Sequence, residues 1–384
     1  MTNAIFDLSN MFFRSMFIVG GYGKKQYTFD SQREQDQLMR KVATDITSVI
    51  RSINPSRVIF ALDSKSWRKS ISIDENEGYK GHRKKSEVIN WDNIYKIMAE
   101  FAEIVKANGF IVSQIDNAEA DDLMALWRDE LLYNQNQHVV LVSADEDVRQ
   151  LADSISSPKK AFSIIYNPFT QGKNSSKKLF VPDGFKDWLN DEDDIGDIFN
   201  RSIDVDKEDF KRILNDKVNL EEVDGKEIAL RKIFCGDDGD NVPSIYTWLN
   251  DKGKEVRITN KPYQKIIDYI GAKDWKDLME KSEIIFDQLI EISGQKPSFK
   301  MDKRLERQAK LVVLDKSLFP VEIIKDFQDH IHEDYAGNHI SPQTWNMISM
   351  LEGTRYVDTK GRVSSGNEAS IFGQIDRISN KELF

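Results

Sequence analysis

The segment VVLVSADED, residues 139–147, decides the fold because it joins an apolar run directly to a cluster of acids. The run over residues 139–142 is typical of a buried β-strand, and Asp145 and Asp147 follow its end. In an open parallel sheet, the carboxyl ends of the strands line the functional crevice. The segment therefore predicts one strand of such a sheet, with two carboxylates at the edge where a ligand binds.

Other acids repeat this arrangement along the chain. Asp7 follows the apolar run AIF, and Asp63 follows VIFAL. Any single acid of this kind is better explained as a helix cap or a solvated surface residue. The full set is hard to explain in that way, because acids from several strand ends would meet at one place. The further members are Glu119, Asp121 and Asp122 in NAEADDL, and Asp237 and Asp240 in GDDGDN.

Carboxylates that are crowded together repel one another unless cations neutralise them. Hard divalent cations, which prefer oxygen ligands, are the natural occupants of such a cluster. Two cations about 4 Å apart hold the attacking and leaving oxygens of a phosphodiester and lower the pKa of a bound water. The cluster therefore predicts metal-dependent hydrolysis of a phosphodiester bond.

The composition describes a chain of 384 residues that is 40% hydrophobic and 31% charged, long enough for two domains and a tail. The net charge of −10 is concentrated in residues 187–227, which hold 15 acidic and 6 basic residues. Residues 65–85 hold 7 basic and 3 acidic residues, a local excess that suits a polyanion. Because Cys235 is the single cysteine, and neither a secretory signal nor a membrane-spanning run is found, we expect a cytoplasmic protein with no membrane partner.

Apolar strand candidates alternate with helical patterns in the first half of the chain. Strands are expected at residues 4–6, 57–62, 110–115, 139–142 and 162–166, and helices at 35–53, 91–107 and 120–133. This alternation predicts an α/β fold with a mostly parallel sheet and helices on both faces. We expect an α/β domain at residues 1–182, an acidic insertion at 183–227, a smaller helical domain at 228–330, and a C-terminal extension with a flexible tail at 331–384.

Six motifs occur in the order found in 5′ nucleases of the flap endonuclease superfamily: IFDLSNMFFR, FALDSKSWRK, EGYKGHR, NAEADDLMALW, LVSADEDVRQL and GDDGDNVPS. From residue 4 to about 320 the chain resembles these enzymes, most closely the stand-alone bacteriophage form that is called ribonuclease H in T-even phages. The resemblance implies a PIN-like catalytic domain at residues 1–182, with a helical arch around 65–92. It also implies that the helical domain at 228–330 binds duplex DNA as an H3TH-type domain.

The resemblance further implies two Mg²⁺ ions in the active site, with Mn²⁺ as a possible substitute. Tyr79, Lys80 and Arg83 would form the catalytic group, in which Lys80 and Arg83 contact the scissile phosphate and stabilise the charge on its oxygens. The implied metal ligands are Asp7, Asp63, Glu119, Asp121, Asp122, Asp145, Asp147, Asp237 and Asp240.

A second implied set contacts DNA. The stretch GYKGHRKK, residues 78–85, places an aromatic ring beside cations, which suits a single strand, although a solvated basic loop is the plain alternative. The Gly-x-Gly-x-Lys hairpin of the family is replaced here by IYTWLNDKGKEVRITNKPYQ. This departure leaves the family's monovalent-ion site without its motif and suggests a longer duplex-binding loop that includes Lys252 and Lys261. The implied DNA contacts are Arg68, Lys69, Lys84, Lys85, Gly236, Asn241, Ser244, Lys254 and Arg257.

The function that we expect is that of a metal-dependent 5′-3′ exonuclease and flap endonuclease, which acts on RNA primers and 5′ DNA flaps during replication. We expect a phage-encoded monomer in the host cytoplasm that binds branched or RNA-primed duplex DNA. Leu383 and Phe384 are candidates for docking to a sliding clamp or a single-strand DNA-binding protein, and a disordered end is an equal alternative. Two other functions stay open: a PIN-type ribonuclease, which would cut hairpin RNA without a free 5′ end, and a non-catalytic DNA-structure-binding replication protein.

Overall fold

The computed structural model of the chain describes residues 2–21, 27–74, 77–81, 86–108, 110–157, 159–169, 176–190, 207, 210–214 and 218–337. Three predicted site residues, Arg83, Lys84 and Lys85, lie outside these ranges, as does the tail from residue 338 with its predicted docking residues. In the part of the chain that is described, no helix is both long enough and apolar enough to cross a membrane.

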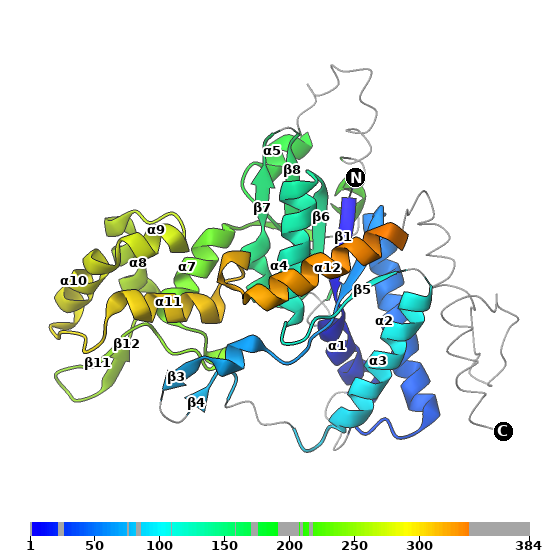
Figure 1. Cartoon of the computed structure of the whole chain (residues 1–384), viewed down its shortest axis with the longest axis horizontal. Helices are drawn as coiled ribbons and strands as arrows, with labels where there is room; N and C mark the ends of the chain where they lie inside the picture. Colours follow the sequence, from blue (N-terminus) through cyan, green and yellow to red (C-terminus); the bar gives the residue numbers. More distant parts are fainter. Residues whose placement is uncertain are drawn as a thin grey trace, which may run out of the picture.

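An eight-stranded sheet forms the centre of the molecule, in the order β10-β9-β8-β6-β1-β2-β5 with β7 beside β8 (Figure 1). Most neighbours are parallel, and β8 pairs antiparallel with β7 and β9. The predicted α/β class and mostly parallel sheet are confirmed, and all five predicted strands fall in this sheet. The strands are β1 (Thr2–Asp7), β2 (Arg57–Ala61), β5 (Ile111–Ser113), β6 (His138–Val142), β7 (Asp153–Ile155), β8 (Ala161–Asn167), β9 (Lys177–Val181) and β10 (Val218–Glu222).

Strand β10 lies within residues 183–227, the range that was expected to be an acidic insertion. It pairs in parallel with β9, so this part of the range belongs to the central sheet. Helix α5 (Phe185–Asn190) precedes it and packs its buried Phe185 against the core. The domain boundaries drawn from the sequence stay predictions.

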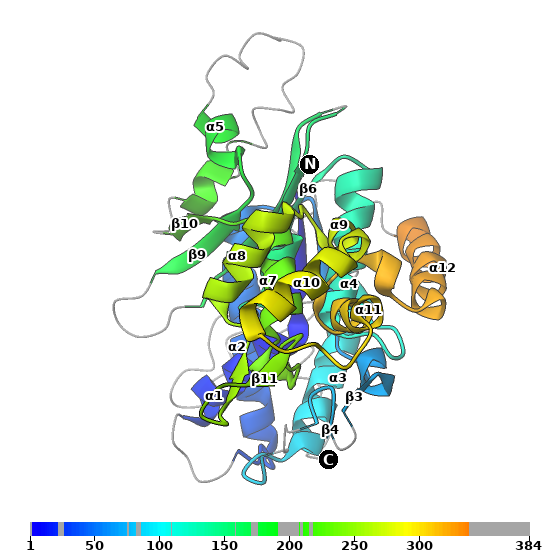
Figure 2. The same cartoon turned by 90° about the vertical axis from the view of Figure 1, so that its left-hand side faces the viewer.

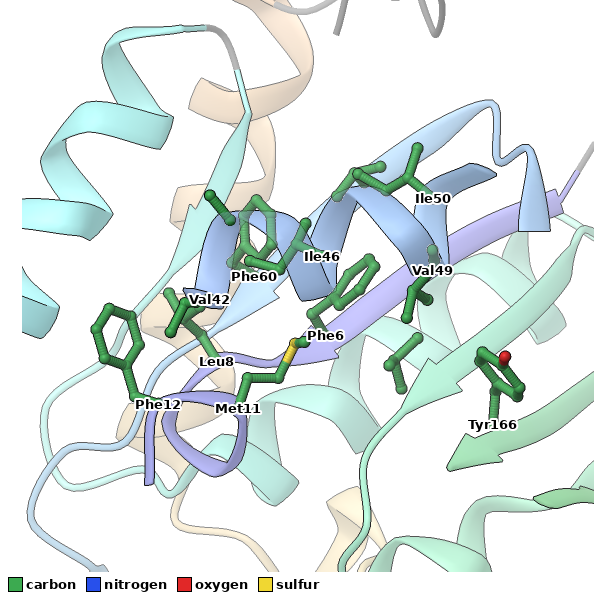
Figure 3. Close-up of a cluster of buried hydrophobic side chains, with 14 of the residues drawn as sticks. Phe6, Leu8, Met11, Phe12, Val42, Ile46, Val49, Ile50, Phe60 and Tyr166 are labelled. Atoms are coloured by element: carbon green, nitrogen blue, oxygen red, sulfur yellow. The ribbon is translucent and has the colours of Figure 1, made fainter. Parts of the chain in front are cut away.

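Helices cover both faces of the sheet because alternate side chains of a strand point to opposite sides. Phe6 and Phe60, with ring centroids 5.4 Å apart, pack on the face that α1 (Leu8–Gly20), α2 (Gln32–Ile53) and α3 (Trp91–Ala107) cover (Figure 3). Ile5 and Ile59 pack on the other face, under α4 (Ala120–Asp129) and α12 (Val321–Gly337). Each buried ring or aliphatic side chain of this kind stabilises the fold by about 1.5–3 kcal/mol.

A second core lies beside the sheet and is mainly helical (Figure 1). Figure 2, viewed from the side of these helices, shows them in front of the sheet. The stretch that was expected to be a long loop contains a short antiparallel hairpin, β11 (Thr247–Leu249) and β12 (Glu255–Arg257). The helices are α7 (Gly225–Cys235), α8 (Asn260–Ile270), α9 (Trp275–Glu280), α10 (Ser282–Ser293) and α11 (Met301–Val312).

Short elements connect the two cores. Two of them lead into the GYKG motif: the 3₁₀ turn η1 (Trp67–Ser70), and a small hairpin of β3 (Ser72–Asp74) and β4 (Glu77–Gly78). The π-helical turn η2 (Glu130–Asn134) follows α4 directly. The remaining short elements are 3₁₀ turns: η3 (Asp147–Leu151), η5 (Asp238–Asp240) and η6 (Lys316–Leu318).

Candidate active site

The first two acids stand at the carboxyl ends of adjacent strands. Asp7 ends β1 and caps α1, where its carboxylate accepts from the backbone N–H of Asn10 at 2.9 Å and from the Ser143 hydroxyl at 3.0 Å. Asp63 follows β2 and accepts from the backbone N–H of Ala120 at 2.8 Å. These bonds fix the orientation of both carboxylates, so that they meet at one edge of the sheet.

A cleft of about 1320 Å³ opens at this edge. Its lining brings together acids from four separate segments of the chain: Asp7, Asp63, Glu119 with Asp121, and Asp145. Two predicted cations, Lys80 and Lys69, line the same cleft. The cleft is therefore large enough for a nucleotide-sized group and carries both charge signs.

Three carboxylates of the cleft, Asp7, Asp63 and Asp121, are destabilised in their charged form. Burial, together with repulsion from Asp63 and Asp145, raises the pKa of Asp7 to about 7. Burial also raises the pKa of Asp63, with repulsion from Glu119, and that of Asp121, with repulsion from Asp122 and Glu119. Oxygen donors that repel one another in a buried site fit divalent cations, which would remove this repulsion.

Glu119 and Asp122 differ from these three acids because basic side chains hold them. Although burial opposes it, Lys80 and Arg68 hold the pKa of Glu119 below its ordinary value. Asp122 is fully buried, and both of its oxygens accept from the Arg68 guanidinium, at 2.7 and 3.0 Å. Asp122 and Arg68 are absent from the lining of the cleft, but one oxygen each of Glu119, Asp121 and Asp122 lie within 4.8 Å of one another.

A second group of acids joins the sheet to the helical core. One oxygen each from Asp147, Asp237 and Asp240 lie within 4.8 Å of one another. Lys232 of α7 bridges Asp147 and Asp237. Burial, moderated by the attraction of Lys232, raises the pKa of Asp147 to about 6. Since the backbone N–H of Asp147 donates to Asp145 at 3.0 Å, this group adjoins the acids of the cleft.

Tyr79 and Lys80 attach the GYKG loop to the same group. The buried Tyr79 hydroxyl donates to Asp240 Oδ2 at 2.7 Å, and the backbone N–H of Lys80 donates to the Asp240 carbonyl at 2.9 Å. Lys80 has a φ of 57° and pairs through its ammonium with Glu119. Tyr79 therefore packs in the helical core and faces Asp240, whereas Lys80 faces the cleft.

Removal of the Tyr79 hydroxyl gives a test of this attachment. We expect Tyr79→Phe to lower the free energy of unfolding by about 1–2 kcal/mol, because Asp240 loses a buried donor. Tyr263→Phe is a matched control in the same core, since its hydroxyl makes one long bond of 3.5 Å to a backbone carbonyl. Urea unfolding in EDTA measures both values, and equal losses in the two variants would contradict the prediction.

The predicted DNA contacts of the helical domain take several positions. The Ser244 hydroxyl is buried and donates to the Phe234 carbonyl at 2.9 Å, so it supports the turn from inside. Arg257 is exposed and makes two bonds to Asp238, at 2.6 and 3.0 Å. Asn241 donates to the Gly78 carbonyl at 3.2 Å, and Lys254 is exposed in the turn of the β11–β12 hairpin. Gly236 ends α7 directly before Asp237.

Several supporting residues were not predicted from the sequence. Ser9, Ser66 and Ser143 bond to the site acids or their backbone, at 3.1, 2.6 and 3.0 Å. Their place within two or three residues of an acid is a weak signal that could have suggested them. Lys232 gives no such signal, because it stands among the apolar and basic residues of an ordinary amphipathic helix.

Comparison with solved structures finds proteins of bacteriophage T5. The T5 D15 protein co-crystallised with metal ions is 19% identical, with a TM-score of 0.49 over 87% of this chain and 99% of that chain. The T5 D15 flap endonuclease in a pseudo-enzyme–product complex with DNA and metal ions is 19% identical, with a TM-score of 0.48 over 87% and 100%. Among curated protein sequences, none matches the chain.

Comparison with protein families gives a direct match over the part of the chain that holds the acids of the cleft. Residues 2–177 match the model described as the 5′-3′ exonuclease, N-terminal resolvase-like domain. This range contains the central sheet up to the start of β9, together with Asp7, Asp63, Glu119 and Asp145. The N-terminal part of the chain is therefore similar to the N-terminal resolvase-like domain of 5′-3′ exonucleases.

Proposed function

We propose that this protein is a divalent-metal-dependent 5′-3′ exonuclease and flap endonuclease that removes RNA primers and 5′ DNA flaps during replication, with Mg²⁺ as its cofactor. The observation that carries the proposal is the cleft, in which acids from four segments repel one another and point at one space. Such a donor set fits hard cations and a phosphate substrate between them better than it fits a structural role.

The residues of the cleft would divide the work as follows. Asp7, Asp63, Asp121 and Asp145 supply oxygens for two divalent ions, and Glu119 offers the oxygen that faces Lys80. When bound, such ions activate a water and stabilise the leaving oxygen. Lys80 keeps its ammonium inside the cleft and would offset the negative charge that builds on the phosphate oxygens.

The attachment of the cleft to the helical core supports a branched substrate. Asp240 and Asn241 hold the Gly78–Lys80 turn through three hydrogen bonds of 2.7–3.2 Å. A duplex bound by the helical core would therefore lie at a fixed distance from Lys80 and the acids. A ribonuclease that recognises only a single strand has no need of this connection, and so we favour the structure-specific nuclease.

The decisive assay uses three labelled substrates: a 5′ DNA flap, an RNA-primed duplex and a hairpin RNA without a free 5′ end. We expect the wild type to cut the first two in Mg²⁺ and to stop in EDTA. Asp145→Asn should cut at least a hundredfold more slowly, about 3 kcal/mol of barrier, because one donor to the ions loses its charge. Asp187→Asn, an exposed acid on α5, is the matched control and should cut like the wild type.

Three results would contradict the proposal. Cleavage that persists in EDTA would remove the metal ions from the mechanism. Equal cleavage of the hairpin RNA would favour the PIN-type ribonuclease. Tight binding of the flap without cleavage in either Mg²⁺ or Mn²⁺ would favour a DNA-structure-binding protein.

A further inference from the structure

Arg68 is a buried cation directly behind the acid cleft. Its side chain is 1% exposed, although the sequence suggested a contact with phosphate. The guanidinium donates to both oxygens of Asp122, at 2.7 and 3.0 Å, and to Glu119 Oε2 at 3.2 Å. A planar guanidinium bound at two points to one carboxylate fixes the orientation of both groups.

Aromatic side chains close the space around this pair. The Arg68 guanidinium carbon lies 4.9 Å from the Trp67 ring centroid and 5.9 Å from that of Phe319. The Trp67 indole N–H also donates to Asp122 Oδ2 at 3.1 Å. Phe319 follows η6, so the chain that leads into α12 completes the enclosure. Because the pair is sealed, a phosphate cannot reach Arg68 without the removal of these rings.

The same pair determines how Glu119 faces the cleft. Glu119 Oε2 is held from behind by Arg68 at 3.2 Å and by the Ser66 hydroxyl at 2.6 Å. This leaves Oε1 to face Lys80 and the cleft. The backbone N–H of Glu119 donates to Asp122 Oδ2 at 3.1 Å, so Asp122 also fixes the first turn of α4, from which Asp121 enters the cleft.

We propose that Arg68 is a positioning residue that acts through Glu119 and Asp122 and does not contact the nucleic acid. Asp122 serves as the internal counter-ion of Arg68, and Glu119 and Asp121 are the acids of this segment that reach the metal ions. This inference rests on the proposed function, because it concerns the binding of divalent ions in the same cleft. Lys69, the residue after Arg68, is exposed and lines the cleft, and it is the residue of this turn that contacts phosphate.

The test compares two neighbouring residues that point in opposite directions. Arg68→Met with Asp122→Leu removes both buried charges together, a change that often leaves stability near neutral. We expect the double variant to bind Mn²⁺ about tenfold to a hundredfold more weakly, measured by electron paramagnetic resonance without DNA. Its Kd for flap DNA in EDTA should stay within about twofold of wild type, because no phosphate contact is lost.

Lys69→Met should give the opposite pattern. Its Mn²⁺ affinity stays at the wild-type value, while its Kd for DNA rises and the salt dependence of binding falls by about one phosphate contact. Arg68→Lys keeps the charge but loses the two-point geometry, and should weaken Mn²⁺ binding without a change in DNA affinity. This single variant carries the test if the double variant does not fold.

Two results would overturn the inference. Wild-type Mn²⁺ affinity in the Arg68 variants would show that Glu119 needs no such support. Weaker DNA binding in EDTA, with a reduced salt dependence, would show that Arg68 contacts phosphate. If the wild type itself binds no Mn²⁺ and cuts no flap, the proposed function fails as well, whereas normal wild-type behaviour with unchanged variants removes this inference alone.

Discussion

Asp7→Asn is expected to make the metal-free protein more stable at pH 8 while it removes the proposed nuclease activity. Burial, with repulsion from Asp63 and Asp145, raises the pKa of Asp7 to about 7, compared with an ordinary value of 3.8. The difference of about three between these two pKa values corresponds to about 4 kcal/mol, by which the charged form of Asp7 destabilises the folded protein. Asparagine carries no charge and is a good helix cap, so it keeps the bond from Asn10.

The pH dependence has a definite sign. Below pH 3.8, Asp7 is protonated in both the folded and the unfolded chain, and the substitution changes little. Between pH 3.8 and about 7, the folded chain binds the extra proton, so wild-type stability falls as the pH rises. The advantage of the variant should therefore grow across this window and stay constant above it.

Urea unfolding in EDTA at pH 4, 6 and 8 measures this advantage. Asp224→Asn is the matched control, because Asp224 also caps a helix but is exposed, and its effect should stay within about 0.5 kcal/mol at each pH. Added Mg²⁺ should stabilise the wild type more than Asp7→Asn, since a ligand that binds the folded state stabilises it. An advantage of the variant that does not change with pH would contradict the assigned cause.

The sheet and the cleft could be predicted because three strands are apolar runs in the sequence and an acid follows the end of each run. Asp7, Asp63 and Asp145 each follow an apolar run, and the carboxyl ends of neighbouring parallel strands must lie side by side. The strands that precede these acids, β6, β1 and β2, are neighbours in the sheet, so the three acids lie close together. Three acids at these strand ends were therefore sufficient to place the site.

The direction of individual side chains was harder to predict. Asp121 and Asp122 are consecutive on α4 and their carboxylates lie close together, yet Asp121 lines the cleft while Asp122 is held by the Arg68 guanidinium. Arg68 and Lys69 differ in the same way on one 3₁₀ turn, with Arg68 buried and Lys69 exposed. The sequence does not distinguish these two basic residues, because their chemistry is similar. The packing of Trp67 against Phe319 determines that Arg68 is the buried one.

The junction between the two cores could not be predicted for a different reason. Lys232 and Asp147 are 85 positions apart, and Tyr79 and Asp240 are 161 apart, so no local pattern connects them. The contact between Lys232 and Asp147 depends on how α7 packs against η3. That packing is close, because a Cβ at Gly225 would lie 2.3 Å from the Gln150 carbonyl oxygen.

Gly236→Ala should be among the most destabilising single substitutions at this junction. Gly236 has a φ of 76° and a ψ of −171°, a backbone region that is essentially confined to glycine and costs other residues about 1–3 kcal/mol. An added Cβ would also lie 2.4 Å from the Val242 carbonyl oxygen and 2.5 Å from the Pro243 carbonyl carbon. Strain and overpacking together should lower the free energy of unfolding by at least about 3 kcal/mol.

Gly253→Ala separates these two causes. Gly253 also has a positive φ, of 68°, but a Cβ there meets nothing within 4 Å. It should therefore lose only about 1–2 kcal/mol, the strain of the left-handed backbone. Gly236→Ala should in addition lose activity, because the 2.8 Å bonds between Asp237 and Val242 close the turn that carries Asp240, which holds Tyr79 and Lys80. Urea unfolding measures the loss of stability, and flap cleavage measures the loss of activity. Equal losses of stability in the two variants would show that the close contact with Val242 does not contribute.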